Sequence, residues 1–242
     1  MGSPGPLLRL LMYVILAGAV LQPLASGQTT DVTAQAKVKF IGAVKTAERH
    51  SNEGVVLWLT PVDGVVSPQS PNATRNRLQL AQKNKEFVPH LLVMQTGSVV
   101  DFPNLDPFFH NVFSLFNGKR FDLGLYESGS SRSVHFDRPG VSYIFCNIHP
   151  EMSAVVVSVP TPYFATSSTA GNLVIHDVAP GTYMMHVWAI GTSDANLVAT
   201  GRRVTVSGGT VDLGTIALEE SVPASHKNKF GEDYDTKNSS PY

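Results

Sequence analysis

The feature that most constrains the fold of this chain is its series of short apolar runs separated by glycine, proline, asparagine and serine. Val141–Cys146 and Ser153–Val159 are two examples, and both are rich in β-branched or aromatic side chains. Short runs of this kind at regular spacing, with turn residues between them, are typical of a β-sandwich or barrel. Long apolar runs with a helical period are absent from the sequence after residue 27. The chain is therefore predicted to be all-β.

The predicted strands fall into three groups along the chain. The first group is Ala36–Val44 and Gly54–Thr60, the second lies between Arg77 and Val159, and the third lies between Gly171 and Leu218. In the second group, Phe87–Met94 is expected to be an edge strand because it contains an early proline.

The remaining segments are predicted to be irregular. Residues 61–76, with three prolines, are expected to form a loop or linker, and residues 116–130 a loop that includes Phe121–Tyr126. The tail, residues 219–242, is polar and has few apolar anchors, so it is predicted to be disordered.

Residues 1–27 have the layout of a secretory signal peptide. Arg9 supplies a positive charge, the apolar run Leu10–Val20 follows it, and Leu24–Gly27, with its small residues, comes last. This pattern predicts cleavage just before Gln28 and export to the periplasm or the extracellular space. The apolar run is short for a membrane span, although an uncleaved anchor is the alternative. No later segment is long and apolar enough to cross a bilayer, so the mature chain is expected to have no membrane span.

The charge balance excludes one large class of partner. The chain carries 18 Lys and Arg against 19 Asp and Glu, for a formal net charge of −1, and its basic residues form no run. Nucleic-acid binding normally relies on a basic patch that faces the phosphates. We therefore expect no nucleic-acid partner.

Cys146 is the single cysteine of the chain. Exported proteins normally pair their cysteines because their compartment is oxidising, and Cys146 has no internal partner. One interpretation is a buried, inert cysteine that acts as a small hydrophobe. The other is a thiol that is used in chemistry and protected by what it binds.

The neighbours of this cysteine favour the second interpretation. Cys146-Asn-Ile-His-Pro-Glu-Met152 brings a thiol, an imidazole and a thioether into one short loop between two apolar strands. Two His, one Cys and a weak axial Met are the ligands of a type 1 (blue) copper site. A Cys-x-x-His pair also occurs in zinc sites, but these prefer closed sets of Cys and His, and the chain has no second cysteine. The loop thus predicts one copper per chain, with Cys146, His149 and Met152 as three of its ligands.

The second histidine has to come from another part of the chain. His110 is the best candidate because it begins a predicted strand directly after a loop, among aromatic residues that can shield a metal. His135 alternates with Val134 and Phe136 and is expected to face solvent, while His90 is a further candidate at the start of a strand. Four protein ligands leave no open position for a substrate, so no enzymatic activity is expected.

Residues 82–159 resemble the cupredoxins, the family of plastocyanin and amicyanin. The resemblance rests on Phe87-x-Pro89, Gly97-Ser-Val-Val-Asp-Phe-x-Asn104, His110-Asn-Val112, the Pro139-Gly140 turn and Cys146-x-x-His149-Pro-x-Met152. It implies a Greek-key β-sandwich over residues 77–160, with His110, Cys146, His149 and Met152 as the ligands. It also implies that the side chain of Asn111 ties the ligand loop to its neighbouring strand.

The segments on either side resemble a different module. Gly42–Thr60 and Gly171–Trp188 are similar to the carboxypeptidase-regulatory or CNA-B type of β-sandwich. Residues 33–65 and 161–218 are therefore expected to close a second, smaller, prealbumin-like sandwich around an inserted cupredoxin domain, with two independent small pieces as the alternative. The whole arrangement resembles bacterial secreted proteins that are named after methylamine utilisation, a name that proves no substrate.

The cupredoxin resemblance implies a one-electron carrier. The edge of His149 would be the electron port, and Pro150, Pro107 and Phe108 are expected to form an apolar patch around it. Such a patch suits a small, transient interface with a redox protein such as a c-type cytochrome or a dehydrogenase. The alternatives are a copper chaperone or store, a surface binding or adhesion module that uses the fold as a scaffold, and a catalytic role with an additional open metal site at His90 or His135.

Overall fold

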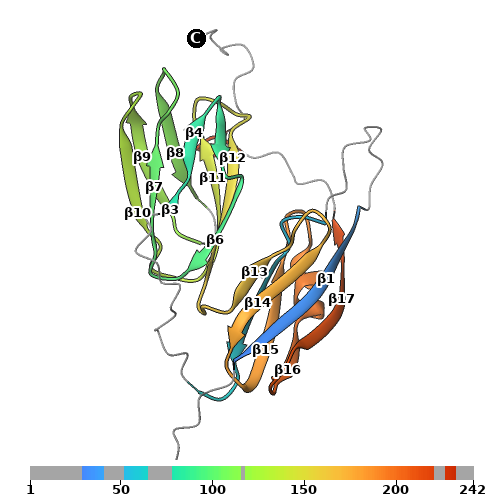
Figure 1. The fold of residues 1–242 in the computed structure, drawn as a ribbon. Coiled ribbons are helices and arrows are strands. Elements are labelled where there is room, and N and C mark those ends of the chain that lie inside the picture. The colour runs from blue at the N-terminus through green and yellow to red at the C-terminus, as the bar shows by residue number, and fades with distance from the viewer. Residues whose placement is uncertain (1–28, 41–51, 65–77, 116–117, 221–226, 233–242) are drawn as a thin grey trace, which may run out of the picture.

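The computed structural model describes residues 29–40, 52–64, 78–115, 118–220 and 227–232. These residues form seventeen strands and one short helix, in two bodies that lie side by side (Figure 1). The all-β prediction is therefore confirmed. In the part of the chain that the structure describes, no helix is long and apolar enough to cross a bilayer. The predicted signal peptide, residues 1–27, lies outside the described residues.

The first body, the site sandwich, consists of the strands between residues 78 and 159. They are β3 (Leu78–Gln79), β4 (Ala81–Lys83), β5 (Glu86–Val88), β6 (Leu91–Gln95), β7 (Val99–Pro103), β8 (His110–Ser114), β9 (Phe121–Tyr126), β10 (Ser131–His135), β11 (Gly140–Cys146) and β12 (Ser153–Val159). One sheet has the order β6-β12-β11-β8-β9 and the other the order β10-β7-β3, while β4 pairs with β5. The apolar core includes Phe102 of β7, Ile144 of β11 and Phe136. Each such side chain contributes about 1.5–3 kcal/mol by leaving water.

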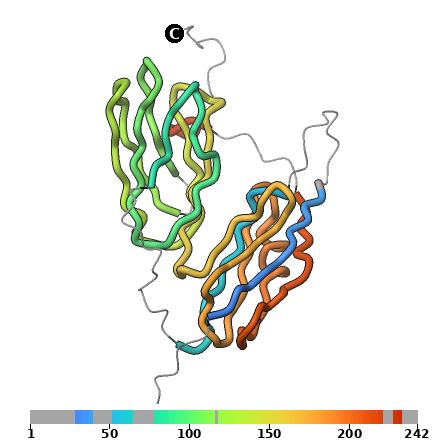
Figure 2. The backbone as a smooth tube through the Cα atoms, in the orientation of Figure 1, coloured from blue at the N-terminus to red at the C-terminus, as the bar shows by residue number. Residues whose placement is uncertain are grey.

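The second body, the flanking sandwich, combines strands from both ends of the chain. They are β1 (Thr30–Phe40), β2 (Val56–Pro61), β13 (Phe164–Thr166), β14 (Asn172–Val178), β15 (Gly181–Trp188), β16 (Arg202–Val206) and β17 (Val211–Glu220), with the helix α1 (Asp194–Thr200) before β16. The sheets have the orders β14-β1-β17 and β13-β2-β15-β16. Leu57 of β2, Ile175 of β14 and Met185 of β15 belong to the core between them. Figure 2 shows the blue strand β1 beside the red strand β17 in this body.

Strand β12 packs against the core of the site sandwich with one face and against the flanking sandwich with the other. Ala154 and Val156 face the core of the site sandwich, whereas Val155, Val157 and Val159 pack in a second cluster with Val56 and Trp188 of the flanking sandwich. Successive side chains of a strand point to opposite faces. Because both faces of β12 are buried, its sequence is a continuous apolar run rather than an alternating one.

Three expectations about individual elements need correction. Residues 121–126 are strand β9 and not a loop. The alternation typical of a strand is interrupted there by Gly124, which has a φ of +69° and sits in a bulge. The single run Phe87–Met94 is divided between β5 and β6 at the cis Val88–Pro89 bond. Strand β6 is nevertheless an edge strand, as the proline suggested.

The third correction concerns the tail. Strand β17 continues to Glu220, and residues 227–232 form a hydrogen-bonded turn that contacts the site sandwich, so the prediction of disorder is wrong for these residues. Its other residues, 221–226 and 233–242, lie outside the described part of the chain. Polar composition misled the prediction because this turn is held by hydrogen bonds and not by buried apolar side chains.

Candidate metal centre

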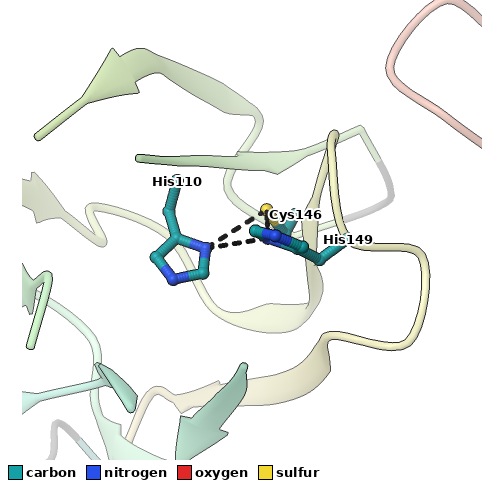
Figure 3. A group of neighbouring side chains, drawn as sticks. All are labelled: His110, Cys146 and His149. Carbon is teal, nitrogen blue, oxygen red and sulfur yellow. Dashed lines mark hydrogen bonds between the residues drawn. The ribbon is translucent and has the colours of Figure 1, made fainter. Parts of the chain in front are cut away.

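Two adjacent strands and one loop bring three ligand-type side chains together (Figure 3). His110 is the first residue of β8, and Cys146 is the last residue of β11. These strands pair antiparallel with Cys146 opposite Val112, which places Cys146 close to the start of β8. His149 follows in the loop that leads from β11 to β12. The register of this strand pair therefore places His110 beside the loop that begins at Cys146.

The distances between the three side chains suit a shared metal ion. The Nδ1 atoms of His110 and His149 are 3.1 Å apart. The Cys146 Sγ atom lies 3.7 Å from the first of these nitrogens and 3.6 Å from the second. A transition metal with bonds of about 2.0–2.1 Å to nitrogen and about 2.3 Å to sulfur would contact all three atoms at these separations. The donor set of two imidazoles and one thiol fits copper.

The orientation of His110 is imposed by Asp106. The ring is fully buried, and its Nε2 atom lies 2.9 Å from Asp106 Oδ2. A carboxylate can only accept a hydrogen bond, so the ring proton resides on Nε2 and the Nδ1 lone pair is directed at the metal position. Asp106 is not among the residues that the sequence analysis selects, because it lies in an irregular loop. Its spacing of four residues before His110 was the one local signal of its role.

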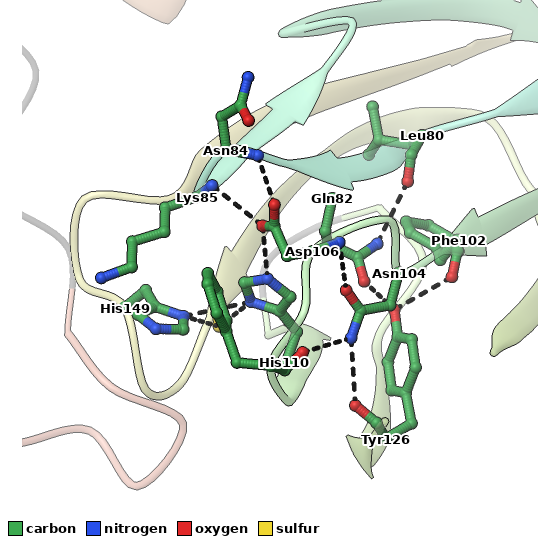
Figure 4. Close-up of polar contacts among 12 residues, drawn as sticks. Leu80, Gln82, Asn84, Lys85, Phe102, Asn104, Asp106, His110, Tyr126 and His149 are labelled. Atoms are coloured by element: carbon green, nitrogen blue, oxygen red, sulfur yellow. Dashed lines mark hydrogen bonds and ion pairs between the residues drawn. The ribbon is translucent and has the colours of Figure 1, made fainter. Parts of the chain in front are cut away.

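Asp106 is itself fixed by the β4–β5 hairpin (Figure 4). The backbone N–H groups of Asn84 and Lys85 donate to its two carboxylate oxygens at 2.5 and 3.0 Å. Burial raises the pKa of Asp106, but the hydrogen bonds from Lys85, His110 and Asn84 outweigh it and leave the pKa below its usual range. The carboxylate therefore stays ionised and available as an acceptor.

The protonation states of the three side chains favour metal binding near neutral pH. Burial lowers the pKa of His110 despite the opposing effect of Asp106, and burial and the neighbouring His110 lower the pKa of His149. Burial raises the pKa of the Cys146 thiol, although backbone N–H groups, including that of Asn111, oppose this. Both imidazoles are thus neutral ligands, and a metal has to displace the proton of the thiol.

Met152 closes the ligand loop. Its side chain is buried in the same apolar cluster as Cys146. Its backbone N–H donates to the His149 carbonyl at 3.1 Å, and its carbonyl accepts from the Cys146 N–H at 3.3 Å. These two bonds make residues 146–152 a compact turn that keeps Met152 close to Cys146 and His149.

The structure gives Asn111 a different contact from the expected one. Its side-chain Nδ2 donates to Asp122 Oδ1 on β9 at 2.7 Å and not to the ligand loop. The link to the ligand loop is made by its backbone carbonyl, which accepts from the Asn147 N–H at 3.2 Å. The expected role of the Asn111 side chain is therefore corrected, because the bulge in β9 turns Asp122 toward it.

The two other candidate histidines lie outside this group. Among the described residues, His110, Cys146 and His149 form the group whose donor atoms are all within 4.8 Å of one another. His90 is exposed and its Nδ1 lies 3.0 Å from the Ser153 carbonyl oxygen, and His135 is exposed, as its alternation predicted. No further ligand comes from either residue.

Apolar side chains occur in the same loops as His110 and His149. The ring of Phe108 lies 5.2 Å from that of His110 and 5.5 Å from that of His149, and Pro107 and Pro150 are exposed. The loops also expose three large apolar side chains that the sequence analysis did not select: Leu105, Phe109 and Ile148. These loops therefore expose more apolar side chains than the three that were expected to form the patch, Pro107, Phe108 and Pro150.

The similarities to known proteins are similarities of structure and not of sequence family. No family model matches the sequence, and no curated protein matches it. Among solved structures, the purple cupredoxin from Nitrosopumilus maritimus is 23% identical over 34% of this chain and 99% of its own, with a TM-score of 0.31. A reduced amicyanin variant is 19% identical over 42% of this chain and 99% of its own, with a TM-score of 0.33. The copper-containing nitrite reductase from Thermus scotoductus is 17% identical over 50% of this chain and 28% of its own, with a TM-score of 0.33.

Proposed function

We propose that this protein is an exported type 1 copper protein that carries single electrons between redox partners. His110, Cys146, His149 and Met152 would hold the copper ion in this proposal. The observation that supports it is the convergence of two imidazole nitrogens and one thiol sulfur within 3.1–3.7 Å of one another. When bound, copper would provide a Cu(II)/Cu(I) couple that takes one electron from a donor and passes it to an acceptor.

The side chains around the site are suited to a ligand set that does not rearrange. His110 is held by Asp106, and Asp106 is held by the β4–β5 hairpin. Ligands that are fixed by packing and by outer hydrogen bonds keep their geometry when the charge of the metal changes. A one-electron carrier needs such a site because each rearrangement slows the transfer.

The path for the electron is the half-buried ring of His149, since His110 and Cys146 are buried. Pro107, Phe108 and Pro150 surround this ring in the proposal and give an apolar contact for a redox protein such as a c-type cytochrome or a dehydrogenase. A small apolar contact of this kind exchanges partners quickly. The cupredoxin domain, residues 77–160, would be the functional unit, with the flanking sandwich as its support.

The visible absorption spectrum during titration with Cu(II) tests the metal site. We expect an intense thiolate-to-copper band in the parent protein and its loss in Cys146→Ala. His90→Ala is the matched control, because His90 is an exposed histidine outside the group, and it should retain the full band. A parent protein that stays colourless when its copper content equals one ion per chain would refute the type 1 site.

Electron transfer is tested separately from copper binding. A carrier should show a reversible one-electron couple by voltammetry and should exchange electrons with a c-type cytochrome without losing its copper. A chaperone or store should release copper to an acceptor protein and show slow or irreversible electrochemistry. The second result would keep the ligand set and overturn the carrier function.

A further inference from the structure

We propose that Lys229 is a positioning residue for the metal site, because it bonds Asn147 directly and Asn111 through Asp122, and these asparagines directly follow the proposed ligands Cys146 and His110. Lys229 belongs to the C-terminal turn Asn228–Glu232, which we call the tail turn. This inference rests on the proposed ligand set. In it, a segment that is far from the site in sequence helps to keep the ligands in place.

The tail turn has a defined internal structure. The Asn228 N–H donates to the Glu232 carbonyl at 2.9 Å, and the Gly231 N–H donates to the Asn228 carbonyl at 3.0 Å. The Asn228 side-chain oxygen also accepts from the N–H groups of Phe230 and Glu232 at 2.9 and 3.1 Å. Four hydrogen bonds across five residues order the turn without apolar burial, in the manner of an Asx turn.

The tail turn contacts the site sandwich through both ends of one residue. The Lys229 backbone N–H donates to the side-chain oxygen of Asn147 at 3.1 Å. The Lys229 Nζ atom donates to Asp122 Oδ2 at 2.9 Å. Figure 2 shows this red segment at the end of the site sandwich that carries the ligand loop. One residue thus reaches the ligand loop and the edge strand β9 at the same time.

A bulge in β9 directs Asp122 toward the site. Asn111 pairs with Leu125 and Phe113 pairs with Asp122, so β9 has one extra residue over this stretch. Gly124 takes up the extra length with a φ of +69°, and its N–H donates to Asp122 Oδ1 at 2.9 Å. A bulge re-aims a side chain that would otherwise follow the regular pleat. The same Asp122 oxygen then accepts from Asn111 Nδ2 at 2.7 Å.

The four residues form a closed ring of hydrogen bonds. Lys229 bonds Asn147 and Asp122, Asp122 bonds Asn111, and the Asn111 carbonyl accepts from the Asn147 N–H at 3.2 Å. Asn111 follows His110 in the chain, and Asn147 follows Cys146. Displacement of either asparagine would therefore move a ligand atom.

The ion pair in this ring of hydrogen bonds contributes little to the stability of the fold. We therefore expect the ring to act by fixing the positions of the ligand side chains. The Lys229 and Asp122 side chains are 25% and 41% exposed, and exposed pairs contribute little. A metal site, in contrast, depends on its ligands being held within about 0.5 Å of the working geometry. The effect of Lys229 should consequently be visible in the site and small in the free energy of unfolding.

Variants of Lys229 in the full-length protein test this inference. Lys229→Met removes the ammonium group, Lys229→Pro removes the ammonium group and the backbone N–H, and Lys229→Arg keeps both contacts. Lys119→Met is the matched control, because the Lys119 Nζ atom bonds Asp137 at 3.0 Å on the same sandwich. The Lys119 side chain is 23% exposed, close to the value for Lys229. Two rates are measured: the reaction of Cys146 with a thiol reagent in the metal-free protein, and the loss of Cu(II) from the loaded protein to a chelator.

We expect Lys229→Pro to raise both rates about tenfold and Lys229→Met to raise them by a smaller factor, while Lys229→Arg and Lys119→Met stay at the parent values. A change in the position of the thiolate-to-copper band should accompany the faster copper loss. Parent-like rates in Lys229→Pro, or an equal rise in Lys119→Met, would overturn the inference. The thiol measurement needs no copper, so it decides the role of Lys229 even if the parent protein proves not to bind copper.

Discussion

Replacing Asp106 by alanine should destabilise the metal-free protein by about 2–6 kcal/mol. The buried His110 ring would lose the acceptor of its Nε2–H, which by itself costs about 1–3 kcal/mol. The Asn84 and Lys85 N–H groups would also lose a charged acceptor. Asn84 is exposed and Lys85 is half-buried, so water can replace part of that loss and their joint cost is about 1–3 kcal/mol.

Asp106→Asn separates the two parts of this effect. One amide oxygen can still accept from His110, but the NH₂ group then faces a backbone N–H as donor against donor. We expect a smaller loss of about 1–2 kcal/mol. Asp137→Ala is the control, since Asp137 is half-exposed and pairs only with other surface side chains, Lys119 and Arg138. It should leave the free energy of unfolding close to the parent value.

The assays are urea denaturation of the metal-free variants and copper competition against a chelator. Since Asp106 sets the direction of the His110 lone pair, copper affinity should fall about 10–100-fold in Asp106→Ala. Equal free energies of unfolding for Asp106→Ala and Asp137→Ala, together with parent-like copper affinity, would show that the carboxylate does not orient His110.

Three other properties of the protein can be tested in the same preparations. Met152→Leu should change the unfolding free energy by less than about 1.5 kcal/mol, because the two side chains have nearly the same volume. It should nevertheless shift the reduction potential of the copper-loaded protein, which voltammetry measures. An unchanged potential would argue against Met152 as axial ligand. Burial raises the pKa of the Tyr183 phenol to about 12, so the folded state keeps a proton that the unfolded state loses above pH 10, and stability should fall by up to about 3 kcal/mol between pH 10 and 12. Denaturation curves of Tyr183→Phe should show a smaller decline, because burial also raises the pKa values of Tyr126 and Tyr143; an equal decline in both proteins would contradict the assignment. Gly171→Ala should cost more than about 2 kcal/mol of folding free energy, because a Cβ there would lie 2.3 Å from the Ala36 carbonyl oxygen at a φ of +88°. Gly129→Ala is the control, since Gly129 has a φ of +76° but open space around it, and it should cost about 1 kcal/mol. Equal thermal shifts in the two variants would rule out the contact with Ala36 as the cause.

Much of the architecture follows from local patterns in the sequence. Alternation and turn residues predict most of the strands, because both features depend on neighbours within a few positions. The ligand loop is also local: Cys146, His149 and Met152 lie so close along the chain that any turn between two paired strands keeps them together. His110 was selected from its position at the start of a strand, and the pairing of β8 with β11 places it beside Cys146.

The contacts that orient these ligands were decided by the tertiary structure. Asp106 depends on backbone N–H groups of a hairpin more than twenty residues away, and backbone donors carry no signature in the side-chain sequence. Asp122 depends on a bulge that interrupts the period of β9, and so its strand resembled a loop. Lys229 reaches Asn147 across 82 residues through one polar turn. Local spacing can thus place donor atoms along a chain, but only packing between distant segments fixes where their lone pairs point.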